Sequence, residues 1–260
     1  MAEKFSFRNN LNFIEVKMQQ NIEFRKGVIR PVECYREAFE LTKNQYWLLL
    51  AITLVGMIIG GATFYVLLGA MICGIYYCYF QAIDGRKVEF EGLFKGFGYF
   101  VPSLLVTALI VVPMIVVFAA VYFPFIMVAV MGSRLSEEEF MALLVGTLGV
   151  DLIITIAMVC LHTLLMFAFP LIVDKNLPAW QSIKLSARAV WGNLGGVGGL
   201  IGLSFVATLA GYLALCIGIY LVIPLILAST AVAYRKVFPQ AESLGAPPSP
   251  DAFPGAGNYT

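Results

Sequence analysis

The sequence predicts an all-α, polytopic membrane protein with six transmembrane helices. Of its 260 residues, 60% are hydrophobic and only 13% are charged, and the mean hydropathy is +0.85. Soluble domains are about 25% charged. Four long runs contain no Asp, Glu, Lys or Arg, and these are 44–83, 96–133, 152–173 and 189–234. The net charge of +1 gives no basic footprint for nucleic acid, so no nucleic-acid partner is expected.

The length of each run predicts how often it crosses the bilayer. A crossing needs about 20 apolar residues, because a helix rises 1.5 Å per residue and the hydrocarbon core is about 30 Å thick. Run 44–83 therefore makes two crossings that turn at Gly60 and Gly61, and run 189–234 makes two that turn near Gly211. Run 152–173 makes one.

Run 96–133 is long enough for one crossing or two, and the distribution of basic residues favours one. With one crossing, every Lys and Arg except Arg134 lies on a single side, which the positive-inside rule identifies as the cytoplasm. With two, residues 174–188 and the C-terminus would lie outside. Six crossings then place both termini in the cytoplasm, and the spare residues near 123–131 are expected to form an irregular or re-entrant stretch after Pro124.

Three amphipathic segments precede the first, third and fifth crossings. Their apolar positions follow helical spacing and are flanked by basic residues, which predicts helices lying in the cytoplasmic interface. The first segment presents Val32, Tyr35, Ala38, Phe39 and Thr42 on its apolar face. The aromatic residues expected to contact the membrane surface in the other two are Phe90, Phe94, Phe97, Trp180 and Trp191.

The two hairpins and their preceding segments show weak internal similarity. A shift of 149 positions aligns the first hairpin with the last and pairs Arg86 and Lys87 with Arg235 and Lys236, which suggests a parallel hairpin repeat. Three regions follow: a cytoplasmic arm at 1–30, a six-helix transmembrane domain at 31–238, and a Pro- and Gly-rich tail at 239–260 that is too poor in apolar residues to build a core.

Six glycines at the start of the fifth crossing are expected to mediate helix packing. Their spacing includes pairs four residues apart, which lets helix backbones approach closely in lipid. A phosphate-binding loop is the weaker reading, because no strand precedes them. The six are Gly192, Gly195, Gly196, Gly198, Gly199 and Gly202.

Asp151 and His162 are the candidate residues for transport or ligand binding. They lie eleven residues apart, about three helical turns, so they project from nearly the same face. Ionisable groups within a membrane are often functional, although a hydrated Asp151 and a His162 bonded to a carbonyl or to Thr163 are the more ordinary reading. A haem needs a second axial ligand that this chain's single histidine does not supply. No catalytic residue, metal site or cofactor is predicted.

Several residues in the second half resemble a known family. From Phe169 the chain reads Phe-Pro-Leu-Ile-Val-Asp, followed by Ala179, Ser182, Ser186, Asn193, a Gly-rich span, Gly218-Ile219, Pro224 and Ala233-Tyr234-Arg235. This succession resembles an uncharacterised bacterial family of six-helix inner-membrane proteins and the membrane domain fused to some glycerophosphodiester phosphodiesterases. The resemblance covers about residues 32–238. It implies a protein of the bacterial cytoplasmic membrane linked to lipid metabolism or envelope upkeep, and it supplies no catalytic residue.

The expected function is that of a non-enzymatic scaffold or accessory subunit. Its partners would be membrane lipids, other membrane proteins or a second copy of itself. The alternative is a small transporter or channel with a polar path near Asp151 and His162.

Overall fold

The computed structural model describes residues 22–130, 136–214 and 217–239, and every regular element within these ranges is helical. Elements marked η are 3₁₀ helices. In chain order the elements are α2 (Pro31–Thr42), η1 (Lys43–Gln45), α3 (Tyr46–Ala62), α4 (Leu68–Ile83), η2 (Phe90–Tyr99), α5 (Phe100–Val130), α6 (Glu137–Leu164), α7 (Ala168–Lys175), α8 (Ala179–Trp191), α9 (Leu194–Leu213) and α10 (Ile217–Val237).

Within the described residues, five helical stretches are long and apolar enough to cross a membrane. They are Pro31–Ala62, Phe90–Phe123, Glu137–Lys175, Leu194–Leu213 and Gly218–Val237. The remaining expected crossing is α4, whose 16 residues are fewer than the about 20 that a full crossing needs. The fold and composition together define an all-helical protein of the membrane-spanning class.

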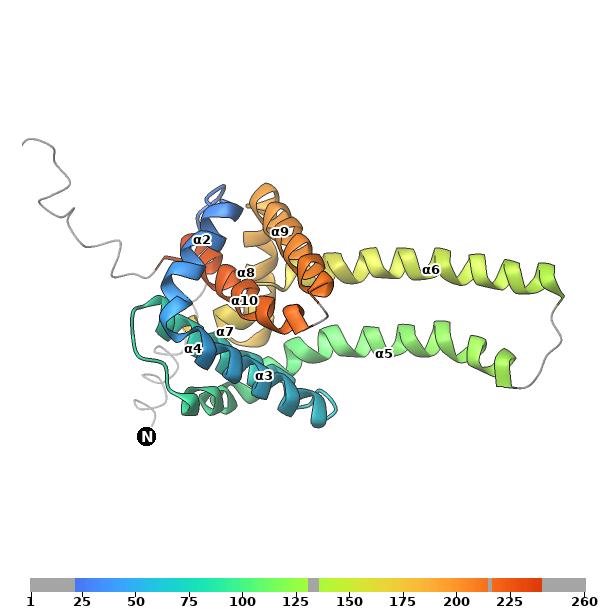
Figure 1. Cartoon of the computed structure of the whole chain (residues 1–260), viewed down its shortest axis with the longest axis horizontal. Coiled ribbons are helices and arrows are strands. Elements are labelled where there is room, and N and C mark those ends of the chain that lie inside the picture. The colour runs from blue at the N-terminus through green and yellow to red at the C-terminus, as the bar shows by residue number, and fades with distance from the viewer. Residues whose placement is uncertain (1–21, 131–135, 215–216, 240–260) are drawn as a thin grey trace, which may run out of the picture.

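The helices α5 and α6 form a long hairpin that projects from a compact body built by the other helices (Figure 1). The expected irregular stretch after Pro124 is wrong, because α5 continues as a helix through Pro113 and Pro124 to Val130. A helix that lies in an apolar environment satisfies its own backbone hydrogen bonds and tolerates proline there. The expected single crossing at 152–173 is also interrupted, because α6 ends at Leu164 and α7 begins at Ala168.

The outer part of this hairpin exposes a large apolar surface. The side chains of Val112, Phe118, Leu148 and Ile153 are each more than half exposed. Both helices contact the body only near their inner ends, where they meet α4, α7, α8 and η2. So much exposed apolar surface is typical of a segment immersed in lipid.

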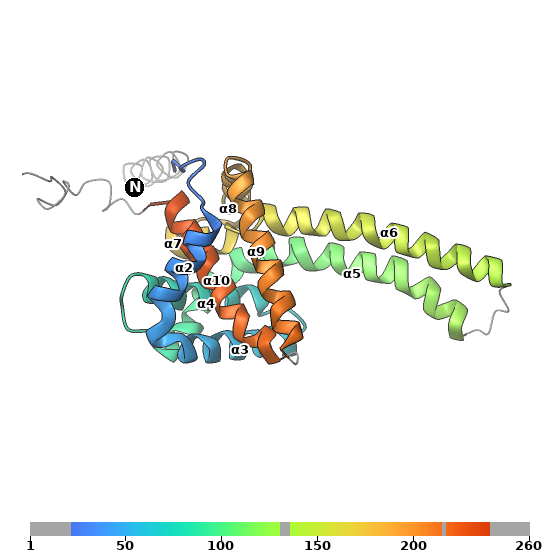
Figure 2. The ribbon, with the colours of Figure 1, turned by 45° about the horizontal axis from the view of Figure 1, so that its top comes forward.

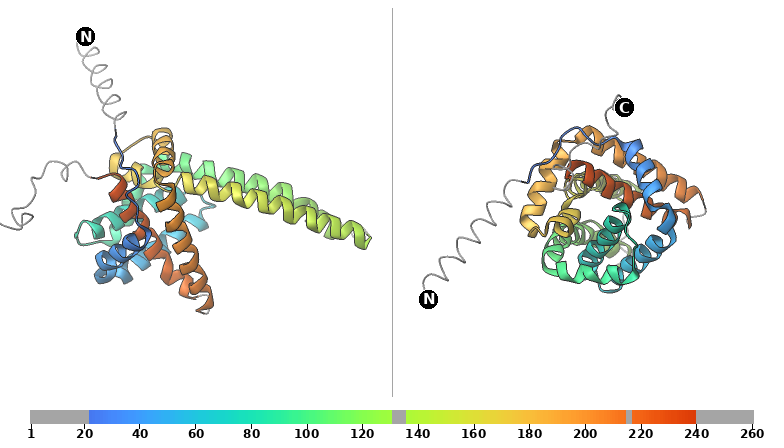
Figure 3. Two further views of the ribbon diagram at one scale, coloured as in Figure 1. Left: turned by 90° about the horizontal axis from the view of Figure 1, so that it is seen from above. Right: turned by 90° about the vertical axis from the view of Figure 1, so that its left-hand side faces the viewer.

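The helix α4 lies at the centre of the body, inside a ring of other helices (Figure 3, right). Small residues let its neighbours approach: Gly74 of α4 faces Leu93 of η2, and Gly96 of η2 faces Ala70 of α4. At both glycines a Cβ atom would overlap the facing carbonyl oxygen, so the two backbones are in direct contact. This is the small-residue packing that membrane helices use.

The helix α10 packs beside α9 and α2 in both Figure 1 and Figure 2. At its C-terminal end, Tyr234 and Phe238 form an aromatic cluster with Phe80 of α4 and with Phe167, and ring centroids lie between 5.1 and 6.3 Å apart. Aromatic pairs at these separations add to the free energy gained by burial. The cluster therefore joins the ends of α4 and α10 to the start of α7.

The three amphipathic segments are helices, and the residues that they bury in the protein are largely distinct from those expected to face the membrane. In α2 the buried residues are Cys34, Ala38 and Thr42, whereas Val32 and Phe39 are 69% and 50% exposed. The second segment is a 3₁₀ helix, and its repeat of three residues places Leu93 and Gly96 inward. In α8 the buried residues are Ala179, Ser182, Ser186, Ala189 and Val190.

Within the N-terminal arm, residues 22–30 are described and lie against the body. The backbone N–H of Arg25 donates to the carbonyl of Val237 at 2.9 Å, and Ile29 is buried. Residues 1–21 and the tail from 240 lie outside the described residues.

Candidate functional site

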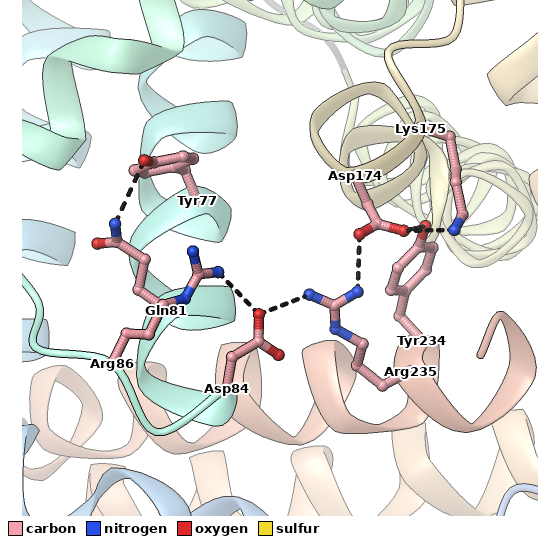
Figure 4. A network of polar contacts seen from close by, with 8 residues as sticks. All are labelled: Tyr77, Gln81, Asp84, Arg86, Asp174, Lys175, Tyr234 and Arg235. Carbon is pink, nitrogen blue, oxygen red and sulfur yellow. Dashed lines mark hydrogen bonds and ion pairs between the residues drawn. The ribbon is translucent and has the colours of Figure 1, made fainter. Parts of the chain in front are cut away.

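A network of charged and polar side chains connects the ends of three helices (Figure 4). The guanidinium of Arg235, at the end of α10, donates to Asp174 at 2.7 Å and to Asp84 at 3.1 Å. Asp84 follows α4 and Asp174 lies near the end of α7. The hydroxyl of Tyr234 also donates to Asp174, at 2.8 Å, and Arg86 forms an ion pair with Asp84 at 2.8 Å.

Burial distinguishes this network from ordinary surface ion pairs. The side chains of Arg235, Asp174 and Asp84 are 14%, 10% and 21% exposed. The guanidinium carbon also lies 4.4 Å from the centroid of the Phe80 ring, where a cation–π interaction is favourable. The side chains of Asp84 and Asp174 are therefore shielded from solvent more than those of ordinary loop carboxylates. The network fixes the ends of α4, α7 and α10 at one end of the molecule.

A cavity of about 510 Å³, open at the surface, lies where α5 and α6 join the body, and His162 and Val159 in its wall are exposed. Helices α3, α4, α5, α6, α7, α9 and α10 all contribute to its wall. This volume is within the range of small-molecule sites, about 300–1,000 Å³. The lining residues are Met57, Ile72, Ile75, Tyr76, Ile110, Val159, His162, Thr163, Leu165, Met166, Phe169, Ile201, Ser204, Ile226, Leu227 and Thr230.

Most hydroxyl groups in this wall are already hydrogen-bonded within the protein. Thr163 donates to the carbonyl of Val159, Thr230 donates to the carbonyl of Ile226, and the Ser204 hydroxyl bonds that of Tyr35 at 2.6 Å. The cavity therefore presents a largely apolar surface. Among the described residues no side-chain hydrogen bond is found for His162 or Tyr76, so these two can bond a polar group of a ligand.

The structure separates the two ionisable residues expected to act as a pair. His162 lines the cavity, whereas Asp151 does not. Asp151 lies eleven residues earlier in α6, about 16 Å along the helix axis. A shared face therefore does not bring them to one site.

The six glycines of the fifth crossing divide into two sets. Gly192, Gly196 and Gly199 face the described part of the arm, where a Cβ atom at Gly196 would lie 2.5 Å from Ile29 and one at Gly199 would lie 2.5 Å from Pro31. Gly195, Gly198 and Gly202 have no such neighbour within 4 Å among the described residues. The first set thus packs against residues 24–31.

Substituting Gly196 by alanine should lower the stability of the purified protein by about 2 kcal/mol, because the new methyl group would overlap Ile29, including its carbonyl oxygen. Thermal unfolding in detergent measures this. The matched control is Gly195→Ala, which faces open space and should be neutral or stabilising by up to about 1 kcal/mol through helix propensity. Equal unfolding temperatures for the two variants would contradict this packing.

The aromatic residues expected at the membrane interface lie mostly on the surface. Trp180 and Trp191 are 63% and 66% exposed, and Phe94 and Phe97 are 45% and 44% exposed. The Phe94 and Phe97 rings are parallel, with centroids 6.4 Å apart, and Phe90 contacts Phe94. Exposed aromatic rings of this kind are typical of membrane–water interfaces.

Sequence reasoning missed both the Arg235 network and the contact between Gly74 and Gly96. The signal for the network was present in the run Val-Asp174 and in Tyr234-Arg235, which were noted only as part of a family resemblance. These residues lie 60 positions apart, and only the fold brings them together.

No protein-family model matches the chain, and no curated protein or solved structure matches it. The resemblance to bacterial six-helix inner-membrane proteins therefore stays a prediction.

Proposed function

We propose that this protein is a non-enzymatic integral membrane protein that binds lipid in its central cavity and serves as a scaffold or accessory subunit. The observation that supports this is the 510 Å³ cavity, which is lined mainly by apolar side chains. It lies in a protein whose described helices include several that are long and apolar enough to cross a membrane. Acyl chains are the most abundant apolar ligand in that environment. A chain that moves from the bilayer into the cavity gains no free energy from leaving water, so van der Waals packing against the wall and bonds to its polar groups hold it there.

The same cavity suggests how the ligand is oriented. The imidazole of His162 and the phenol of Tyr76 can bond the ester or hydroxyl groups of a lipid, while the aliphatic wall holds its chain.

Filling the cavity should displace the lipid. Ile201→Trp places an indole in the cavity wall, so we expect its retained lipid, measured by native mass spectrometry of the purified protein, to fall at least about fivefold. The control is Leu209→Trp. Leu209 lies on the same helix, but its side chain is 50% exposed, so this variant should retain as much lipid as the wild type. Equal lipid retention by Ile201→Trp and the wild type would rule out the cavity as the binding site.

Transport is the second candidate function, and the position of His162 in the cavity wall favours it. Proton flux into liposomes that contain the protein tests it, with an expected loss of flux in His162→Ala. No flux above that of empty liposomes, or wild-type flux in the variant, would reject this alternative.

We further infer that the end of the molecule carrying the Arg235 network faces the cytoplasm, in a bacterial inner membrane crossed six times. The basic residues before α2, after α4 and at the end of α10 support this. Helices α2, α3 and α4 correspond in order to α8, α9 and α10. Adding 149 to the first residue number of each helix in the first set gives the first residue of its counterpart to within one position, which supports a parallel repeat. A membrane-impermeant reagent applied from the periplasm should leave Lys184→Cys unlabelled.

A further inference from the structure

We propose a second lipid site, specific for the phosphate of an anionic phospholipid headgroup, where the N-terminal arm meets the end of α8. A pocket of about 420 Å³ lies there, lined by Phe24, Lys26, Arg188, Trp191 and Gly192. None of these residues lines the central cavity, so this site stands independently of the function proposed above.

The pocket is held in place by the side-chain amide of Asn193. Its nitrogen donates to the carbonyls of Arg25 and Ala189 at 3.1 and 2.9 Å, and its oxygen accepts the backbone N–H of Val28 at 3.2 Å. This buried residue fixes the arm against α8 and thereby sets the position of Lys26 relative to Arg188.

Gly192 allows the arm to close over the pocket. A Cβ atom there would lie 2.9 Å from the ring of Phe24 and 3.1 Å from the side chain of Lys26. Any larger residue would push the arm away and widen the pocket. The glycine therefore contributes to the shape of the site as well as to helix packing.

The cations at this site lack acidic partners within the described part of the chain. Six other cations form ion pairs with described carboxylates: Arg30, Lys43, Arg86, Lys175, Arg235 and Lys236. By contrast Lys26, Arg188 and Lys184 form no ion pair with any described residue. Lys184 lies one turn before Arg188 on the same face of α8, and its ammonium sits 4.9 Å from the centroid of Trp180. Unpaired cations grouped in this way favour an anion, and a guanidinium is well suited to a phosphate.

The two tryptophans identify the anion as part of a lipid. Trp180 and Trp191 flank the basic residues and are both largely exposed, as tryptophans at the headgroup level of a bilayer are. The pocket also lies near the end of α10 that carries the Arg235 network, because the backbone N–H of Arg25 donates to the carbonyl of Val237. Basic pockets at such a boundary bind anionic headgroups.

The test measures binding of short-chain lipids to the full-length protein in detergent, followed by the fluorescence of its tryptophans. Dioctanoyl phosphatidylglycerol should bind more tightly than dioctanoyl phosphatidylcholine, and inorganic phosphate should compete only weakly. The double variant Lys26→Gln with Arg188→Gln should bind phosphatidylglycerol about thirtyfold more weakly, because each cation near a headgroup contributes about fivefold.

Matched variants separate a specific site from general electrostatics. Arg36→Gln with Lys87→Gln removes two exposed cations that form no described ion pair elsewhere, and it should bind like the wild type. Lys26→Arg with Arg188→Lys keeps both charges and should retain most of the affinity, while an unchanged unfolding temperature shows that each variant is folded. Equal affinity for the two lipids, equal losses in the two double-glutamine variants, or phosphate competing as strongly as phosphatidylglycerol would each overturn the proposal.

Discussion

Replacing Gly74 by alanine should destabilise the protein by about 3 kcal/mol or more, enough to abolish its recovery as a folded species. A Cβ atom at this position would overlap the backbone carbonyl of Leu93, and a backbone group cannot rotate away as a side chain can. The helix must move to relieve the overlap, and α4 packs against neighbours on every side. Overpacking at such a site outweighs the about 1 kcal/mol that alanine gains over glycine in a helix.

Thermal unfolding and size-exclusion chromatography in detergent measure this effect. Gly96 lies on η2, on the opposite side of the same helix contact. Gly96→Ala should lower the stability by a similar amount, because its Cβ would overlap the carbonyl oxygen of Ala70 in α4. Gly98→Ala is the control, since no described atom outside its own helix lies within 4 Å of its Cβ position. A Gly74→Ala protein as stable as Gly98→Ala would show that α4 and η2 are not in backbone contact.

Replacing Arg235 by methionine should cost about 3 kcal/mol. Methionine fills similar space but removes the cation that Asp84 and Asp174 share. Among the described residues, Asp84 then has only the exposed Arg86 as an ion-pair partner, and Asp174 has only Lys175. Their mutual repulsion and desolvation would separate the ends of α4, α7 and α10. The unfolding temperature of the purified protein measures the loss.

Two further variants show whether the effect comes from this network. Arg86→Met removes another cation bonded to Asp84, but its side chain is 60% exposed and the expected loss is below about 1 kcal/mol. Combining Arg235→Met with Asp174→Asn should be less destabilising than the sum of the single changes, because the second change removes a partly buried carboxylate that has already lost its bond to Arg235. Strict additivity would mean that the two residues do not interact.

The sequence predicts the helices well because their signals are local. Length and hydropathy identify the apolar segments, and proline and amphipathic spacing mark α2 and α8 before their crossings. The charge distribution predicts one crossing over run 96–133, and one long helix, α5, lies there. The continuation of that helix through Pro124 was not predicted, because proline normally interrupts a helix and its tolerance depends on the surroundings of the helix.

The candidate sites are harder to predict because they depend on which faces meet. His162 could be singled out as the only histidine, yet its cavity is formed by residues from seven helices. Spacing alone joined it to Asp151, although Asp151 does not line that cavity. The glycine stripe was recognised as a packing surface, but its partner is the extended arm at residues 24–31, which carries no strong signal of its own.

A lipid in the cavity beside His162 should be visible in an electron cryomicroscopy map of the protein embedded in a lipid bilayer. We expect continuous, elongated density along Ile72, Ile201 and Leu227, with its polar end near His162 and Tyr76. A cavity that contains only ordered water, or one closed by its own side chains, would contradict the proposed lipid-binding function.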